Sequence, residues 1–208
     1  AVLEELGEPP LPPYIARDGS APAGAGDRER YQTVYARVPG SIAAPTAGLH
    51  FSAGAPAALA ARGIGLAKIV LHVGPGTFTP VSAEDVTGHR MQAESYAVSA
   101  EAAAALRAAR DAGRRIVAVG TTVVRVLETI APRLDGGGAF AGETSLFITP
   151  GHRFALPGAL VTNFHLPRST PYVLAAAFAG LETLRAAYAS AIALKYRFLS
   201  YGDAMLVR

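Results

Sequence analysis

Apolar positions fall into short runs and longer stretches that alternate along the chain from Arg30 onward. Short runs rich in β-branched residues predict strands, and longer Ala- and Leu-rich stretches that stop near a glycine predict helices. The predicted strands are 66–73, 89–98, 116–119, 145–148, 160–164 and 204–207, and the predicted helices are 53–61, 99–112, 121–130, 170–178 and 181–194, with a short helix opening at Ser82 and a glycine-rich loop at 134–142. This order predicts an α/β fold with a largely parallel sheet and flanking helices.

Residues 1–30 differ in composition from the rest of the chain. Four prolines at 9, 10, 12 and 13 precede a run of Ala, Gly, Ser and Asp at 18–27. Such a composition cannot easily form a packed core. We therefore expect an extended linker at 1–30 and one main domain at 31–208.

Composition narrows the possible chemistry. The chain has no cysteine, which excludes disulfides, thiolate nucleophiles, zinc–thiolate sites and iron–sulfur clusters. Neither His-x-His nor His-Glu-x-x-His spacing occurs, so we expect no metal site. A net charge of +3 suits an anionic partner. No apolar stretch approaches the ~20 residues needed to span a bilayer, so we expect a cytoplasmic protein.

Three predicted strands end in turns rich in Gly, Thr or Ser, at 70–77, 117–122 and 161–170. In α/β proteins, ligands bind where strands end and helices begin, because free backbone N–H groups collect there. The first turn lacks the third glycine of a dinucleotide-binding loop and the Gly-Lys of a P-loop. It either lets a ligand approach the backbone beside His72, or is a tight turn with His72 in the core.

The second and third turns carry more polar groups. Thr121 and Thr122 either bind an anion or polar ligand at a helix start or act as a plain helix cap. Arg125, one turn on, faces either the same site or solvent. The segment 162–170 packs Asn, His, Arg, Ser and Thr into nine residues, more than a simple connection needs.

Other polar positions give weaker signals. The loop 41–51 holds a histidine near its end, His50. Under strict alternation His89 and Glu94 lie on opposite faces of one strand, so spacing alone does not make them a catalytic pair. His152 follows a Pro-Gly turn and is expected at the surface.

Taken together, these segments resemble the S-adenosylmethionine:tRNA ribosyltransferase-isomerase family of queuosine biosynthesis. The matching stretches run nearly end to end, at 11–15, 29–36, 43–51, 71–74, 76–78, 120–122, 162–167, 196–198 and 200–205. The resemblance implies a large, barrel-like α/β domain interrupted by a small inserted β-barrel. Residues 1–30 would then return from that insert, and the chain would lack the N-terminal part of the large domain and most of the small one.

The resemblance also implies an activity. The family transfers and isomerises the ribosyl group of S-adenosylmethionine onto 7-aminomethyl-7-deazaguanine at the tRNA wobble position, giving epoxyqueuosine-tRNA, adenine and methionine. S-adenosylmethionine is a co-substrate, no prosthetic group is expected, and the tRNA anticodon loop is the macromolecular partner. A base must act near the ribose 5′-carbon and an acid must protonate departing adenine.

Candidate site residues follow from the matching positions. The acid–base candidates are His50, His72, His89 and His165, since histidine titrates near working pH. The substrate-binding candidates are Thr46, Gly48, Gly74, Gly76, Thr77, Glu94, Gly120, Thr121, Thr122, Arg125, Asn163, Arg168, Ser169, Thr170, Arg197, Tyr201 and Asp203, with Lys195 as a further phosphate contact. We expect the histidine-bearing turns to converge on one cavity.

Three positions depart from the family pattern. Gln92 stands where the family usually has a histidine, Ala193 replaces a common glutamate, and Leu199 replaces a phenylalanine. Two alternatives therefore stay open. One is a paralogue that uses S-adenosylmethionine on a small-molecule acceptor, and the other is a non-catalytic chain that binds RNA.

Overall fold

The computed structural model describes residues 7, 10–12, 14–15, 26–74 and 86–208. The predicted helix opening at Ser82, most of the predicted linker, and the candidate residues Gly76 and Thr77 lie outside this part. The helices are α2 (Asp27–Arg30), α3 (Ala55–Ala61), α4 (Ala100–Asp111), α5 (Thr121–Ile130), α6 (Thr170–Ala179) and α7 (Leu181–Ala193), with 3-10 turns η1 (Thr46–His50), η3 (Val86–Gly88) and η4 (Ala131–Gly136). The strands are β1 (Ile69–His72), β2 (Glu94–Val98), β3 (Ile116–Val119), β4 (Phe140–Thr144), β5 (Pro157–Asn163) and β6 (Ala204–Val207).

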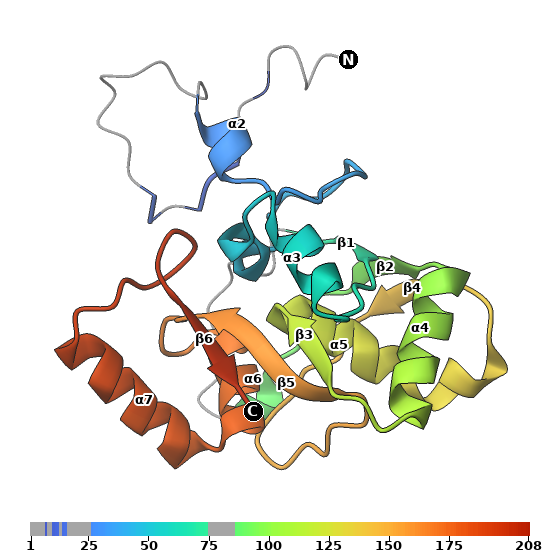
Figure 1. Cartoon of the computed structure of the whole chain (residues 1–208). Helices are drawn as coiled ribbons and strands as arrows, with labels where there is room; N and C mark the ends of the chain where they lie inside the picture. The colour runs from blue at the N-terminus through green and yellow to red at the C-terminus, as the bar shows by residue number, and fades with distance from the viewer. Residues whose placement is uncertain (1–6, 8–9, 13, 16–25, 75–85) are drawn as a thin grey trace.

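The strands form two three-stranded sheets, ordered β1-β2-β4 and β3-β5-β6 (Figure 1). The first is antiparallel throughout, with Leu71 opposite Tyr96. In the second, β3 and β5 are parallel and β5 and β6 antiparallel. An α/β protein is thus confirmed, but a mostly parallel sheet is wrong for the described strands. The order of elements along a sequence does not fix which strands become neighbours, and β6 returns antiparallel to β5 after α7.

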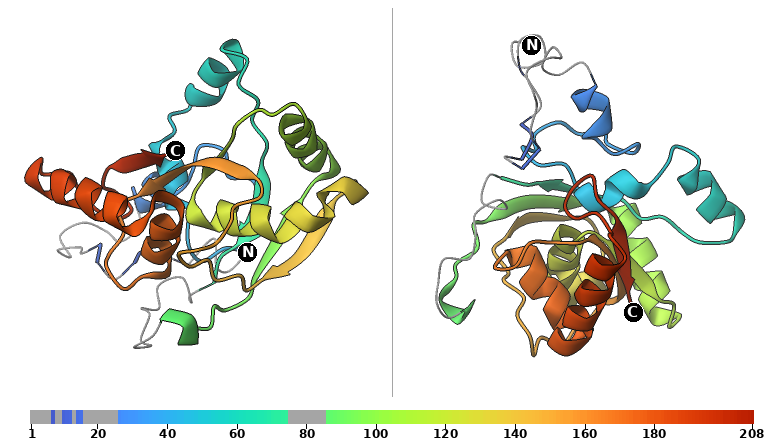
Figure 2. Two further views of the ribbon diagram at one scale, coloured as in Figure 1. Left: turned by 90° about the horizontal axis from the view of Figure 1, so that it is seen from below. Right: turned by 90° about the vertical axis from the view of Figure 1, so that its left-hand side faces the viewer.

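The two sheets share no strand pairing in the described ranges, so the barrel-like sheet is not observed there. Helix α5 contacts β3 and β5 of one sheet and β4 of the other (Figure 2). Its side chains Val124 and Ile130 are fully buried, together with Leu134, Ile148 and Leu160. A second cluster, built on Phe164 and Tyr188, holds α6 and α7 against the end of β5. No helix in the described portion is long and apolar enough to cross a membrane.

Local signals located most elements. The bounds of β3, α5 and β6 match the prediction, and the Ser99 hydroxyl caps α4 by accepting a hydrogen bond from the Ala102 amide at 3.1 Å. In strand β3, Ile116 and Ala118 are buried but Val117 is 47% exposed. Successive side chains point to opposite faces of a sheet, so the face that carries Val117 is open to solvent.

The strand predicted at 145–148 is wrong, because the strand is β4 (Phe140–Thr144), which begins in the segment 134–142 predicted as a loop. Gly142 lies opposite Tyr96, and a Cβ there would be 3.5 Å from the Tyr96 hydroxyl. This is an ordinary van der Waals distance, so the space beside Tyr96 does not by itself require glycine. The apolar residues Leu146 and Ile148 belong to the core as an irregular segment.

Candidate functional site around Asn163

Asn163, the last residue of β5, joins three segments that are far apart in sequence. It is 1% exposed. Its Oδ1 accepts a hydrogen bond from the Thr46 hydroxyl at 3.0 Å, and its Nδ2 lies 2.9 Å from His50 Nε2 and 3.3 Å from the Leu199 carbonyl oxygen. Two segments thus supply three contacts to one amide, since η1 carries both Thr46 and His50. We call these residues the Asn163 cluster.

The tight turn η1 brings Thr46 and His50 against β5. The Gly48 amide donates to the Pro45 carbonyl at 2.7 Å, and the Phe51 amide donates to Gly48 at 3.2 Å. A side chain at Gly48 would collide with the Tyr35 hydroxyl. Glycine at 48 therefore lets the turn lie close to the segment 31–35.

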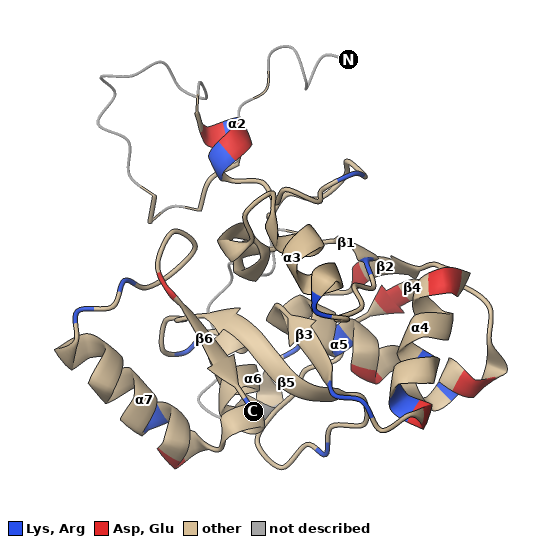
Figure 3. Ribbon diagram, viewed as in Figure 1, with Lys and Arg blue, Asp and Glu red and all other residues tan. Residues whose placement is uncertain are grey.

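The loop 197–203 supplies the other side of the cluster. Leu199 has a positive φ of 71°, a conformation that is costly for a branched side chain. Its N–H donates to the Phe164 carbonyl at 2.9 Å, and its carbonyl accepts from Gly202 at 3.1 Å and from Asn163. The Asp203 carboxylate accepts from the Arg197 amide at 2.7 Å and closes the loop. Figure 3 shows Lys and Arg along this stretch between α7 and β6.

His50 lies between the cluster and a surface cavity. The cavity, of about 290 Å³, is lined by His50, Phe51, Ser52, Ala55, Ala58, Leu59 and Arg62. Partial burial lowers the pKa of His50, and the charge of Asp203 opposes this effect. His50 is therefore mainly neutral at neutral pH, with one side of its ring exposed to a ligand-sized hollow.

His165 lies on the other face of β5. Its Nε2 is 2.7 Å from the Thr162 hydroxyl, and its backbone N–H donates to the Tyr188 hydroxyl at 2.7 Å. Successive residues of a strand point to opposite faces, so Thr162 and Asn163 direct His165 and His50 to different sides. Burial lowers the pKa of the His165 imidazole to about 4 and raises that of Tyr188 to about 12.

The remaining histidines have separate surroundings. The His72 ring packs on Gly40, whose φ of 130° and lack of space exclude a side chain. His89 stacks on Phe147 with ring centres 4.9 Å apart. His152 was expected at the surface, but its Nε2 is 2.8 Å from buried Glu128. The expected convergence of the histidines on one cavity is not observed.

The start of α5 forms a second small hollow. Gly120, with φ 100°, is the N-cap and no side chain caps the helix. The plain threonine cap is therefore wrong. A cavity of about 20 Å³ lies here, lined by Met91, Thr121, Thr122, Arg125, Leu146, Phe147, Ile148, Thr170, Pro171 and Leu174. The starts of α5 and α6 thus meet, and Ala47 of η1 lies against Gly120.

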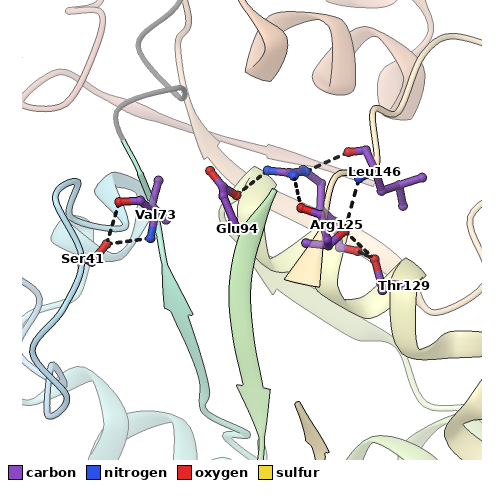
Figure 4. Close-up of polar contacts among 7 residues, drawn as sticks. Ser41, Val73, Glu94, Arg125, Thr129 and Leu146 are labelled. Carbon is purple, nitrogen blue, oxygen red and sulfur yellow. Dashed lines mark hydrogen bonds and ion pairs between the residues drawn. The ribbon is translucent and has the colours of Figure 1, made fainter. Parts of the chain in front are cut away.

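Arg125 is 5% exposed and lines the same small hollow as Thr121 and Thr122, so it faces this hollow and not solvent. Its Nη1 pairs with Glu94 Oε2 at 2.5 Å, its Nε donates to the Leu146 carbonyl at 2.8 Å, and its Nη2 to the Thr144 carbonyl at 3.0 Å (Figure 4). Thr129 and Thr144 share a hydrogen bond of 2.7 Å beside it. These contacts give Glu94 and Arg125 a structural role, and their contact with substrate stays a prediction.

The other candidates are placed as follows. Ser169 is the N-cap of α6, where its hydroxyl accepts from Tyr172 at 3.4 Å, and the following Thr170 is buried. Arg168 has a positive φ of 59°, as has Lys195. Both are exposed, like Arg197, whereas Gly74 is half-buried beyond β1. The Tyr201 ring lies edge-on to Tyr31 and under Arg30.

Sequence reasoning missed several contributors. Tyr188 holds the His165 backbone, Glu128 accepts from the amides of Ala155 and Leu156, and the Tyr14 hydroxyl bonds Ser200 at 2.6 Å. For Glu128 a signal existed, since a carboxylate interrupts the apolar face of 124–130. Among the described residues, no group of three His, Asp or Glu side chains could hold a metal ion.

The fold and the cluster define a mixed α/β protein with polar groups gathered at the ends of a parallel strand pair and at two helix starts. The family model described as queuosine biosynthesis protein matches residues 1–207, and the chain belongs to this family.

Curated relatives agree with this assignment. S-adenosylmethionine:tRNA ribosyltransferase-isomerase from Methylobacterium sp. (strain 4-46) is 59% identical over 205 residues, which cover 99% of this chain and 56% of the relative. The protein of the same name from Anaeromyxobacter sp. (strain Fw109-5) is 58% identical over 207 residues, covering 100% and 59%. The chain therefore spans little more than half the length of these relatives.

A solved structure is also similar. The S-adenosylmethionine tRNA ribosyltransferase from Thermotoga maritima matches with a TM-score of 0.65 and 47% identity, over 78% of this chain and 51% of that chain. The two structures thus share a fold, and nearly half of the aligned residues are identical.

Proposed function

We propose that this chain carries part of the active site of an S-adenosylmethionine:tRNA ribosyltransferase-isomerase. The reaction moves the ribosyl group of S-adenosylmethionine to the aminomethyl group of 7-aminomethyl-7-deazaguanine at the tRNA wobble position. Its products are epoxyqueuosine-tRNA, adenine and methionine. The protein would act in the cytoplasm, with S-adenosylmethionine as co-substrate and without a prosthetic group.

One observation carries the proposal. Relatives that bear this name are 55–59% identical over 99–100% of the chain. The Asn163 cluster supports it, because Thr46 and His50 of the matching stretch 43–51 meet the buried amide of Asn163 in the matching stretch 162–167. The resemblance also implies a barrel-like sheet, and we propose that such a sheet forms in the full-length proteins of this family.

The chemistry assigns different tasks to different groups. A base removes a proton beside the sulfonium, and an acid serves the departing adenine. The acid–base candidates stay His50, His72, His89 and His165. Thr121, Thr122 and Thr170 supply hydroxyls at the two helix starts, and exposed Arg168, Lys195 and Arg197 are suited to phosphate contact.

Adenine release tests the proposal. The 208-residue chain is incubated with S-adenosylmethionine and tRNA that carries 7-aminomethyl-7-deazaguanine, and adenine is measured by chromatography. Release that requires the modified base supports the proposal. Release with free 7-aminomethyl-7-deazaguanine alone would favour a small-molecule acceptor, and tRNA binding without release would favour a non-catalytic RNA-binding chain.

A further inference from the structure

The amide of Asn163 can take only one orientation. The Leu199 carbonyl can only accept a hydrogen bond, so the group that faces it at 3.3 Å must be the amide nitrogen. The Thr46 hydroxyl then donates to the amide oxygen at 3.0 Å. The reversed amide would place two carbonyl oxygens against each other. The Leu199 carbonyl therefore determines which atom of the Asn163 amide is the oxygen and which is the nitrogen.

The orientation of Asn163 determines the protonation of His50. The amide nitrogen carries two hydrogens, one directed to Leu199 and one to His50 Nε2 at 2.9 Å. Nε2 must then be the acceptor, and the single proton of a neutral imidazole must reside on Nδ1.

We propose that Asn163 is a positioning residue that holds His50 neutral with its proton on Nδ1. His50 then offers a fixed hydrogen-bond donor to a ligand in the adjoining cavity and does not take up a proton during the reaction. A ligand with an acceptor atom, such as a ring nitrogen or a hydroxyl of a nucleoside, fits this donor. The role in catalysis rests on the proposed function, whereas the tautomer does not.

The charged groups around His50 agree with a neutral ring. A second proton on Nε2 would point at the Asn163 N–H, which is repulsive. Partial burial also disfavours the charged ring, and Arg62 lines the same cavity. Asp203, in the loop beyond Leu199, is the group that favours protonation. The Asn163 N–H and burial thus act against one carboxylate.

The proposal leaves His165 as the stronger acid–base candidate of the two histidines that contact the end of β5. Within the described ranges its side-chain partner is the Thr162 hydroxyl, which can donate or accept. The His165 tautomer is therefore not fixed in the way that the Asn163 amide fixes His50.

Nitrogen NMR of the histidine rings tests the proposal without substrate. The chain has five histidines, so ring spectra of the ¹⁵N-labelled full chain can be assigned by single His→Gln variants. We expect the His50 spectrum to show an unprotonated Nε2 and a protonated Nδ1 at neutral pH. A protonated Nε2 at neutral pH would overturn the proposal, whatever the activity of the chain.

Two variants probe the mechanism of this effect. Asn163→Asp replaces the donor by a carboxylate, so the His50 proton should move to Nε2 and the ring should titrate at higher pH. Thr46→Val removes only the donor to Oδ1, and because the Leu199 carbonyl still orients the amide, the His50 proton should stay on Nδ1. A proton on Nε2 in this variant would contradict the proposal, even if the Asp variant does not fold. Thr162→Val is the matched control, since it should alter the ring signals of His165 and leave those of His50 unchanged. An unaltered His50 tautomer in Asn163→Asp would contradict the proposal.

Discussion

Glu94 of β2 and Arg125 of α5 form a buried ion pair with 2.5 Å between Oε2 and Nη1, and this pair ties one sheet to the helix that covers the other. Both side chains are nearly excluded from solvent. The two backbone carbonyls bound by Arg125 belong to β4 and to the irregular segment that follows it. The pair therefore supports the wall of the small cavity at the start of α5.

Replacing Arg125 by Met should destabilise the protein by about 3–5 kcal/mol, because Glu94 would lose its cation inside the protein. Urea unfolding followed by circular dichroism measures the loss. Arg185→Met is the control, since the Arg185–Glu182 pair is exposed and such pairs contribute less than about 1 kcal/mol. Equal effects of the two substitutions would contradict a structural role for the buried pair.

Gly202→Ala should disrupt the loop that carries Leu199. A Cβ at 202 would collide with the carbonyl oxygens of Arg197 and Phe198, which are backbone atoms that cannot move aside cheaply. We expect a loss of at least about 1–3 kcal/mol, as for overpacking, and a changed NMR environment of Asn163. Gly136→Ala, where nothing lies within 4 Å, should have little effect. A fully stable Gly202→Ala variant would show that the loop is less tightly constrained than described.

Stability should fall with acidification between pH 6.5 and about 4 on account of His165. Its pKa is lowered from 6.5 to about 4 by burial, so in this range the unfolded chain binds a proton that the folded chain does not. The contribution is fully present above pH 6.5 and declines by up to about 1.4 kcal/mol per pH unit as the pH falls. Comparing urea midpoints of wild type and His165→Asn across this range isolates the effect. Parallel pH profiles for the two proteins would refute it.

His165→Ala should lower turnover at least ~10²-fold, the low end for a lost acid–base group. Steady-state adenine release with modified tRNA measures this. His152→Ala provides the comparison, because His152 contacts Glu128 and lies outside the Asn163 cluster. Unimpaired turnover in His165→Ala would remove this residue from the reacting site.

Affinity for tRNA should decrease steeply between low and physiological salt. Phosphate contacts release counterions, so the logarithm of the binding constant falls linearly with the logarithm of salt concentration. Fluorescence titration of labelled tRNA at several salt concentrations gives the slope. Changing exposed Arg197 to Gln should reduce the slope, and a flat response in wild type would argue for a small-molecule acceptor.

Local sequence signals predicted where helices and strands lie along the chain better than they predicted which strands pair and which residues meet. Gly120 and the apolar run after it located α5, and Ser99 located the start of α4. Strand β4 was missed because the glycines at 136–138 and 142 are typical of a loop, and its pairing with β2 cannot be read from local sequence. The contact of Asn163 with His50 joins residues 113 positions apart, which periodicity cannot reveal. The alternation of side chains along β5 could have shown that Thr162 and Asn163 point to opposite faces of the sheet.

Transfer of isotope from S-adenosylmethionine to tRNA tests the central claim most directly. The chain is incubated with S-adenosylmethionine labelled with ¹³C in its ribose and with tRNA bearing 7-aminomethyl-7-deazaguanine, and the digested wobble nucleoside is weighed by mass spectrometry. The account predicts that the labelled ribosyl carbons appear in that nucleoside and that Asn163→Ala greatly reduces the yield. Labelled carbon found only outside the tRNA, or a yield unaffected by loss of Asn163, would contradict it.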